Sequence, residues 1–140
     1  MILKIKKIHP DAKIPKYAHH DDAGFDLCTI ENVLIKKGER FPVPTGLVME
    51  IPEGFVGLIW DKGGVSVKYG IKTIAGVVDS TYRGEILVAV MNLGEKDYLF
   101  EKGHKVAQMI IQRKETVEFE EADTLSDTIR GEGRLGSTGK

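Results

Sequence analysis

The sequence lacks the features on which several large classes of protein depend. It has a single cysteine, Cys28, so neither an intrachain disulfide nor a cysteine-rich metal site can form. We interpret Cys28 as a small buried apolar residue. No apolar run is long enough to span a membrane, and the first residues lack the apolar stretch of a signal peptide. These features predict a soluble, cytoplasmic protein with no membrane partner.

An excess of charge of one sign is also missing. The formal net charge is -1 over 140 residues. Proteins that wrap duplex nucleic acid rely on many contacts from Lys and Arg to phosphates. The charge balance therefore argues against a direct nucleic-acid partner. A chain of this length fits one domain and buries enough apolar surface to fold without disulfides.

Helical periodicity is scarce along the whole chain. No stretch keeps apolar residues at helical spacing for three turns, and only one short helical turn, around residues 66–69, is expected. The apolar runs are short, rich in β-branched residues and separated by turn signals, which is typical of a protein made of many short strands. The expected strands cover residues 2–8, 25–30, 46–51, 55–60, 85–92, 105–112 and 117–120.

The run at residues 86–90 is apolar at every position. Such a run is typical of a strand that is covered on both faces. In a small β protein another sheet covers one face, and a second subunit is the natural cover for the other. A sandwich that hides its own central strand is the alternative.

The sequence becomes polar from about residue 122 and holds too few apolar residues to order itself. A frayed terminus is one interpretation. The other is an arm that closes on an anion, because Arg130, Arg134, Ser137 and Thr138 lie among glycines there. Arginine binds phosphate oxygens bidentately, and backbone N–H groups freed by glycine form concave anion sites. Composition alone leaves both interpretations open.

Three further segments could carry chemistry. Asp26 lies within an apolar strand, at a position that alternation assigns to polar contact, and it is either a structural aspartate or a site residue. Lys62 followed by Gly63 and Gly64 suits either an anion-binding loop or a tight turn, and the spacing is wrong for a Walker A loop.

Residues 76–85 form the third segment, which we expect to be a hairpin with a polar turn between two apolar arms. Asp79 either caps that turn or, together with Tyr82, holds a sugar and a water molecule. Residues 19–22, with the sequence His-His-Asp-Asp, resemble a metal-ligand cluster. Neighbouring residues of an extended segment point to opposite sides, however, so no metal bound by these side chains is expected.

Taken together, these segments resemble the five ordered motifs of the trimeric dUTPase family. The match covers nearly the whole chain and consists of residues 23–27, 61–71, 76–85, 102–108 and 130–140. The resemblance implies an all-β fold, a distorted jelly-roll-like barrel or sandwich, with a β domain at 1–121 and a flexible glycine-rich arm at 122–140. It also implies a homotrimer with active sites at the subunit interfaces, over which the arm of one chain closes.

The resemblance further implies hydrolysis of dUTP to dUMP and pyrophosphate by attack of water at the α-phosphorus. Such an activity limits the incorporation of uracil into DNA and supplies dUMP for thymidylate synthesis. Asp79 would be the base that activates the water. Tyr82 would pack on the deoxyribose and exclude UTP, and the backbone of Gly76, Val77 and Val78 would recognise uracil.

The remaining substrate-binding residues that the resemblance implies are Lys62, Gly63, Gly64, Gln108, Arg130, Leu135, Gly136, Ser137 and Thr138. Mg²⁺ would be held by the substrate phosphates and by water, with no direct protein ligand. Asp26 would contact the water around that ion.

The chain departs from the family pattern at four places. Gly63 replaces a serine whose hydroxyl would donate to the phosphate chain, and His104-Lys105 replaces Asp-Arg. Leu135 replaces an aromatic residue over the uracil, and Arg134 replaces a glycine. Leucine covers a base without stacking on it as a ring does. We therefore expect slower turnover and looser closure of the arm.

Three other functions remain open at this point. A nucleotide-binding regulatory protein with weak or no catalysis would explain the lost serine at Gly63. A dCTP deaminase would share the fold, but the Asp79-x-x-Tyr82 pattern argues against it. A structural β trimer would leave the motifs unexplained.

Overall fold

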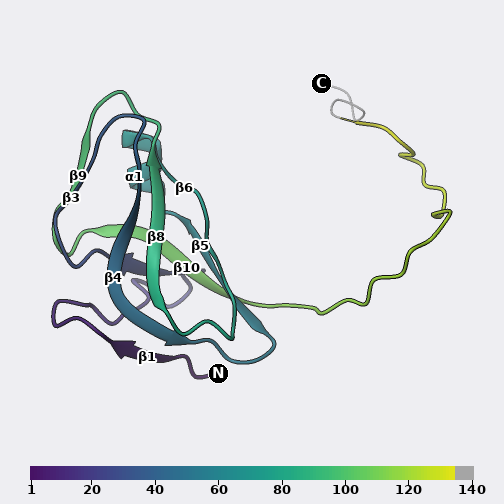
Figure 1. Ribbon diagram of the computed structural model, residues 1–140, viewed down its shortest axis with the longest axis horizontal. Helices are drawn as coiled ribbons and strands as arrows, with labels where there is room; N and C mark the ends of the chain where they lie inside the picture. Colours follow the sequence, from purple (N-terminus) through teal and green to yellow (C-terminus); the bar gives the residue numbers. More distant parts are fainter. Residues whose placement is uncertain (135–140) are drawn as a thin grey trace.

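The computed structural model describes residues 1–134, and its regular structure is almost entirely β (Figure 1). The elements in chain order are β1 (Lys4–Lys7), β2 (Phe25–Cys28), β3 (Val33–Ile35), β4 (Arg40–Glu50), β5 (Phe55–Asp61), α1 (Gly63–Tyr69), β6 (Ile71–Thr73), β7 (Val77–Val78), β8 (Glu85–Asn92), β9 (Tyr98–Phe100) and β10 (Lys105–Arg113). Within these residues no helix is both long and apolar enough to cross a membrane.

Two four-stranded antiparallel sheets form the body of the molecule. Their strand orders are β1-β4-β8-β6 and β2-β10-β5-β7, and β3 pairs with β9 in a separate ribbon. Neither sheet closes on itself, so the part described here is a jelly-roll-like sandwich rather than a barrel. The predicted fold class is confirmed.

Alternating side chains fill the space between the sheets. In β2, Phe25 and Leu27 are buried while Asp26 and Cys28 face away from the core. In β8, Ile86, Val88 and Val90 are buried, but the side chain of Leu87 is 44% exposed. The core therefore covers one face of β8, as predicted, and coverage of the other face by a second subunit stays a prediction. The largest fully buried side chains in the described part of the chain are Phe100, Leu27, Ile35, Leu47, Met49, Ile51, Ile86, Met109, Val43, Val88, Val90 and Val106.

Two of the expected elements are wrong. Residues 76–85 do not form a hairpin, because β7 pairs with β5 in one sheet and β8 pairs with β4 and β6 in the other. The segment therefore crosses from one sheet to the other. Residues 117–120 are not a strand, and Phe119 is 95% exposed. The short helix expected at 66–69 is present and begins earlier, at Gly63.

A bend in β4 holds one end of the crossing segment. Gly46 has a φ of 66°, a left-handed value that favours glycine, and the β4–β8 register shifts between Pro44 and Val48. The backbone N–H of Gly46 donates a hydrogen bond of 2.7 Å to Glu85 Oε1. The bend thereby fixes Glu85, the first residue of β8 and the end of the crossing segment.

Candidate active site

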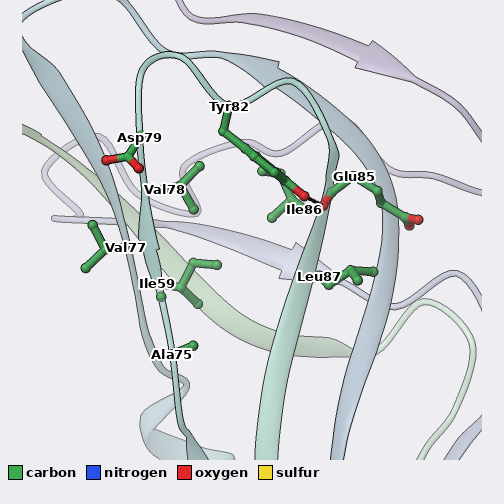
Figure 2. A pocket seen from close by; sticks show the side chains of 10 residues that line it. Ile59, Ala75, Val77, Val78, Asp79, Tyr82, Glu85, Ile86 and Leu87 are labelled. Carbon is green, nitrogen blue, oxygen red and sulfur yellow. Dashed lines mark hydrogen bonds between the residues drawn. The ribbon is translucent and has the colours of Figure 1, made fainter.

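The segment that crosses between the sheets encloses a hollow of about 200 Å³. Figure 2 shows Val77 and Val78 on one side, Ile86 and Leu87 on the other, and Asp79 and Tyr82 on the connecting loop. The backbone N–H of Tyr82 donates to the carbonyl of Asp79 at 3.1 Å and closes the turn. The hollow therefore brings together the residues that the third sequence motif singled out.

The backbone of β7 borders this hollow and has one open side. β7 is an edge strand that pairs only with β5, so the N–H and C=O groups on its other side have no strand partner within residues 1–134. Gly76 lies flat against β5, where its carbonyl accepts the N–H of Ile59 at 2.8 Å. A Cβ at position 76 would lie 2.6 Å from the carbonyl oxygen of Ile59. Only glycine fits here, and the edge can offer its backbone groups to a planar ligand.

Asp79 is exposed on the turn above the hollow. Among residues 1–134 no side-chain hydrogen bond or ion pair holds its carboxylate, whereas other acids in the sheets are paired. An ionised aspartate in this position is able to accept a proton from a water molecule bound in the hollow.

A second cluster lies on the outer face of the β2-β10-β5-β7 sheet. Asp26 Oδ1 lies 2.6 Å from Lys62 Nζ, and Asp26 Oδ2 lies 2.6 Å from Lys105 Nζ. The side chain of Asp26 is only 12% exposed. The Asp26 carboxylate therefore holds the ammonium groups of two lysines next to each other. Gln108 lies directly opposite Asp26 in the register, and its Nε2 donates to the carbonyl of Asp61 at 3.0 Å.

Lys105 is a member of this cluster that the motif comparison did not assign to the site. In a regular strand, residues 105 and 108 would point to opposite faces. The β10–β2 register shifts between Lys105 and Ala107, so Lys105 lies opposite Cys28 while Gln108 lies opposite Asp26. Residues 26 and 28 share a face of β2, and the bulge turns Lys105 to that same face. In the sequence, the signal for Lys105 as a site residue is its position next to His104 in the fourth motif.

The cluster keeps its charges at neutral pH. Burial acts to raise the pKa of Asp26, but hydrogen bonds from Lys105 and Lys62 outweigh it and the pKa is lowered overall. The hydrogen bond from Asp26 raises the pKa of the Lys105 ammonium group. For Asp61, burial is likewise outweighed, here by the N–H and hydroxyl of Thr73, and the pKa is lowered. Two ammonium groups and one carboxylate leave a net positive site that suits an anion.

The glycines after Lys62 are the first residues of α1 rather than a tight turn. The carbonyl of Lys62 accepts the N–H groups of Val65 and Ser66, both at 2.9 Å. Apart from the chain neighbours and the backbone of α1 itself, no described heavy atom lies within 4 Å of a Cβ built on Gly63 or Gly64. The space beside these two residues is therefore open to a ligand.

Other predicted residues are not brought to either cluster. Residues 114–134 form no strand or helix, and Figure 1 shows this segment running away from the sheets after β10. Arg130 is exposed, and its Nε donates to the carbonyl of Gly133 at 3.1 Å. Leu135, Gly136, Ser137 and Thr138 lie outside the described residues.

Cys28 is half-buried rather than fully buried, and burial raises the pKa of its thiol. In the 19–22 segment, His20 Nδ1 lies 2.8 Å from Asp21 Oδ1, and the N–H of His19 donates to Asp22 Oδ2 at 2.8 Å. Over residues 1–134 no three His, Cys, Asp or Glu side chains are arranged to hold a metal ion.

The hollow combines the open backbone edge of a strand, which suits a planar base, with an acid and a phenol. The cationic cluster lies beside a pair of glycines and suits phosphate groups. Together they define a nucleotide-binding β protein that acts on a phosphate group. A sequence model of the dUTPase family matches residues 10–139. The chain belongs to the dUTPase family.

Individual relatives agree with this assignment. The chain is 43% identical over 141 residues to a deoxyuridine 5'-triphosphate nucleotidohydrolase of Clostridium kluyveri, and the match covers 99% of both chains. It resembles the Staphylococcus bacteriophage 80alpha dUTPase with dUpNHpp, with a TM-score of 0.90, 27% identity and 99% of both chains covered. It also resembles a mutant dUTPase from phage phi11 of S. aureus, whose structure describes a structural Mg(II) ion, with a TM-score of 0.83, 25% identity and 89% and 98% coverage.

Proposed function

We propose that the chain hydrolyses dUTP to dUMP and pyrophosphate. The observation that carries this proposal is that Asp79 and Tyr82 lie over one hollow with the open backbone edge of β7. The full-length relative in Clostridium kluyveri bears the name of that activity. In the cell, the reaction would limit incorporation of uracil into DNA and supply dUMP for thymidylate synthesis.

In the proposed reaction Asp79 takes a proton from a water molecule. The water oxygen bonds to the α-phosphorus, the bond from that phosphorus to the bridging oxygen breaks, and pyrophosphate leaves. A base placed in this way contributes roughly 10²–10⁴ in rate. The remaining acceleration comes from cationic groups that stabilise the charge on the phosphates.

Recognition of the nucleoside falls to the hollow. Backbone groups on the open edge of β7, at Gly76, Val77 and Val78, pair with the donors and acceptors of a uracil edge. The ring of Tyr82 packs on the deoxyribose and leaves no room for a 2′-hydroxyl.

The cationic cluster holds the triphosphate. Lys62 and Lys105 supply ammonium groups, and the Gln108 amide has a second N–H besides the one that Asp61 accepts. The open backbone of Gly63 and Gly64 faces the same region, and the arm from Arg130 to Thr138 closes over it. Arg130 adds a bidentate phosphate contact.

Mg²⁺ would be held by phosphate oxygens and water, and when bound it would supply positive charge that neutralises the triphosphate. The donor set fits a hydrated ion rather than a protein cage, because Asp26 is the one acid within the lysine cluster and both of its oxygens accept from lysines. Asp26 would contact the water around such an ion once the lysines bind the phosphates.

Each active site combines parts of different copies in a homotrimer. In one chain Val78 pairs with Gly57 while Gln108 pairs with Trp60. Three residues of strand and two strand spacings separate Val78 from Gln108, which is roughly 14 Å. The side chains of Trp60, Ile74 and Val77 are 53%, 45% and 72% exposed beside the hollow. A neighbouring copy that covers them brings its own lysine cluster to the hollow.

The activity is tested by pyrophosphate release from dUTP with Mg²⁺, with UTP, dCTP and dTTP as parallel substrates. We expect release from dUTP at a rate at least tenfold above the others, since a missing or added substrate group commonly changes kcat/KM by roughly 10- to 200-fold. Ammonia release from dCTP would instead identify a deaminase. No reaction with dUTP would contradict the proposal.

The shared site is tested by mixing two inactive variants, Asp79→Asn and Lys62→Ala, after joint refolding. If each site takes Asp79 and Lys62 from different copies, mixed trimers contain sites with neither change and regain activity. Sites made within one chain would stay inactive. Removal of residues 130–140 should abolish catalysis and leave the mass of the assembly, measured by light scattering, at three chains.

A further inference from the structure

Gly84 lies against the hydroxyl end of the Tyr82 ring. A Cβ built on Gly84 would be 2.3 Å from Tyr82 Oη, 2.5 Å from Cζ and 3.0 Å from Cε2. All three nearest atoms belong to this one side chain. The ring therefore occupies the space that any other residue at position 84 would fill.

Backbone conformation does not require glycine at this position. Among the described glycines, those with positive φ are found at other positions, and Gly84 is not one of them. An alanine at 84 would suit the backbone, and the three atoms nearest to its Cβ would all belong to the ring. This differs from Gly76, where a Cβ would meet the main chain of β5.

Hydrogen bonds hold Tyr82 both at its backbone and at its hydroxyl group. The Tyr82 hydroxyl donates to the carbonyl of Glu85 at 3.1 Å, and the Tyr82 N–H donates to the carbonyl of Asp79 at 3.1 Å. Figure 2 shows the side chain lying across the loop with its hydroxyl at Glu85. Glu85 is itself held by the N–H of Gly46 at 2.7 Å. The position of the ring over the hollow is thus set by the sheet, provided that residue 84 leaves room.

We propose that Gly84 is a positioning residue for sugar discrimination. Because Gly84 has no side chain, the Tyr82 ring lies flat against the loop, in the position that admits a deoxyribose and excludes a ribose. This inference rests on the proposed dUTP hydrolysis and deepens it. Gly84 acts only through the ring and does not touch the substrate. Tyr82 is 46% exposed, so the ring is able to move when position 84 is filled.

The test compares Gly84→Ala with the wild-type protein, using kcat/KM for dUTP and for UTP. We expect the dUTP-to-UTP ratio to fall roughly tenfold or more, in the range that one small steric contact provides. Tyr82→Phe keeps the ring without its hydroxyl and should give a smaller fall. A loss of general stability would lower both kcat/KM values together and leave their ratio unchanged.

A double-variant comparison shows whether Gly84 acts through the ring. In a Tyr82→Ala background, adding Gly84→Ala should leave the ratio unchanged, because the group that it displaces is already gone. If the single variant Gly84→Ala does not fold, a folded double variant with Tyr82→Ala would support the contact between residue 84 and the ring. If neither the single nor the double variant folds, the proposal is overturned. A retained ratio in folded Gly84→Ala would also overturn it. Absence of dUTP hydrolysis in the wild-type protein would reject the proposed function itself.

Discussion

Asp26 and Lys62 form a 2.6 Å ion pair although β2 and β5, which place them, are not neighbouring strands. Asp26 is in β2 and Lys62 follows β5, and β10 lies between these strands. The intervening strand contributes Lys105 to the other oxygen of the same carboxylate. The cluster therefore ties three strands together and at the same time holds two cations ready for a ligand.

Replacement of Asp26 by Asn should lower both stability and substrate binding. Hydrogen bonds to charged groups contribute about 1.5–3 kcal/mol each, and the amide offers one acceptor where the carboxylate offered two. We expect the free energy of unfolding to fall by about 1–3 kcal/mol. We also expect KM for dUTP to rise, since the lysines lose their common anchor. Urea unfolding at one protein concentration and steady-state kinetics measure the two effects.

Asp11→Asn is the matched control for this change. Asp11 lies 2.6 Å from Lys102 Nζ, the same separation, but the two side chains are 40% and 55% exposed. Exposed pairs contribute roughly 0–1 kcal/mol. If the free energy of unfolding falls equally in the two variants, the low exposure of Asp26 does not strengthen its ion pairs.

Acid should weaken the fold through Asp26 and Asp61. Both have a pKa lowered below the ordinary value of 3.8 because hydrogen bonds to the charged form outweigh burial. A lowered folded-state pKa gives stability that is fully present above the unfolded value and is lost as the pH falls through the folded one. The loss should therefore begin near pH 3.8 and continue below it.

Urea midpoints between pH 7 and pH 2.5 measure this loss. Asp26→Asn and Asp61→Asn should each flatten the fall below about pH 4, because the variant has one fewer carboxylate to protonate. A curve as steep as that of the wild-type protein in both variants would assign the acid sensitivity to other groups.

Much of the sheet structure follows from local sequence pattern. The Phe-Asp-Leu-Cys alternation predicts correctly that Asp26 leaves the core while Phe25 and Leu27 enter it. The hairpin expected at 76–85 is wrong. A polar turn between two apolar arms gives the same sequence pattern whether the arms pair with each other or belong to separate sheets. The strand expected at 117–120 is wrong because alternation specifies a face but not a partner, and nothing packs on Phe119 in the described part of this chain.

The hollow could be predicted from the sequence because its residues are contiguous, whereas the lysine cluster depends on register. Gly76, Asp79 and Tyr82 border one hollow because they belong to one short stretch of the chain. Lys105 joins Asp26 only because of an irregularity in β10, which no periodic pattern signals. The tight packing of Gly84 beneath Tyr82 is likewise visible only in three dimensions.

Asp79→Asn should abolish turnover and spare binding. The amide cannot take a proton from water, so we expect kcat to fall by roughly 10²–10⁴. The Kd for dUpNHpp, measured by calorimetry, should stay within about threefold, since the change removes no atom from the hollow and Kd shifts tenfold for every 1.4 kcal/mol. Asp21→Asn, at a side chain that is 96% exposed, serves as the control and should keep full activity. Undiminished turnover in the Asp79 variant would remove that residue from the mechanism.

Gly63→Ser should raise the rate of dUTP hydrolysis. The family pattern has a serine hydroxyl at this position, and loss of one donor to a charged transition state lowers kcat by roughly 10²–10³. The structure leaves room for the change, because nothing outside the adjoining backbone of α1 lies within 4 Å of a Cβ at position 63 among the described residues, and the φ of this residue is not left-handed. Gly63→Ala adds the same Cβ without the hydroxyl and is the matched control. We expect kcat to rise about tenfold or more with serine and to stay unchanged with alanine, measured as pyrophosphate release at saturating dUTP. An equal response to both variants would mean that the residue acts through the stiffness of the first turn of α1 rather than through a phosphate contact.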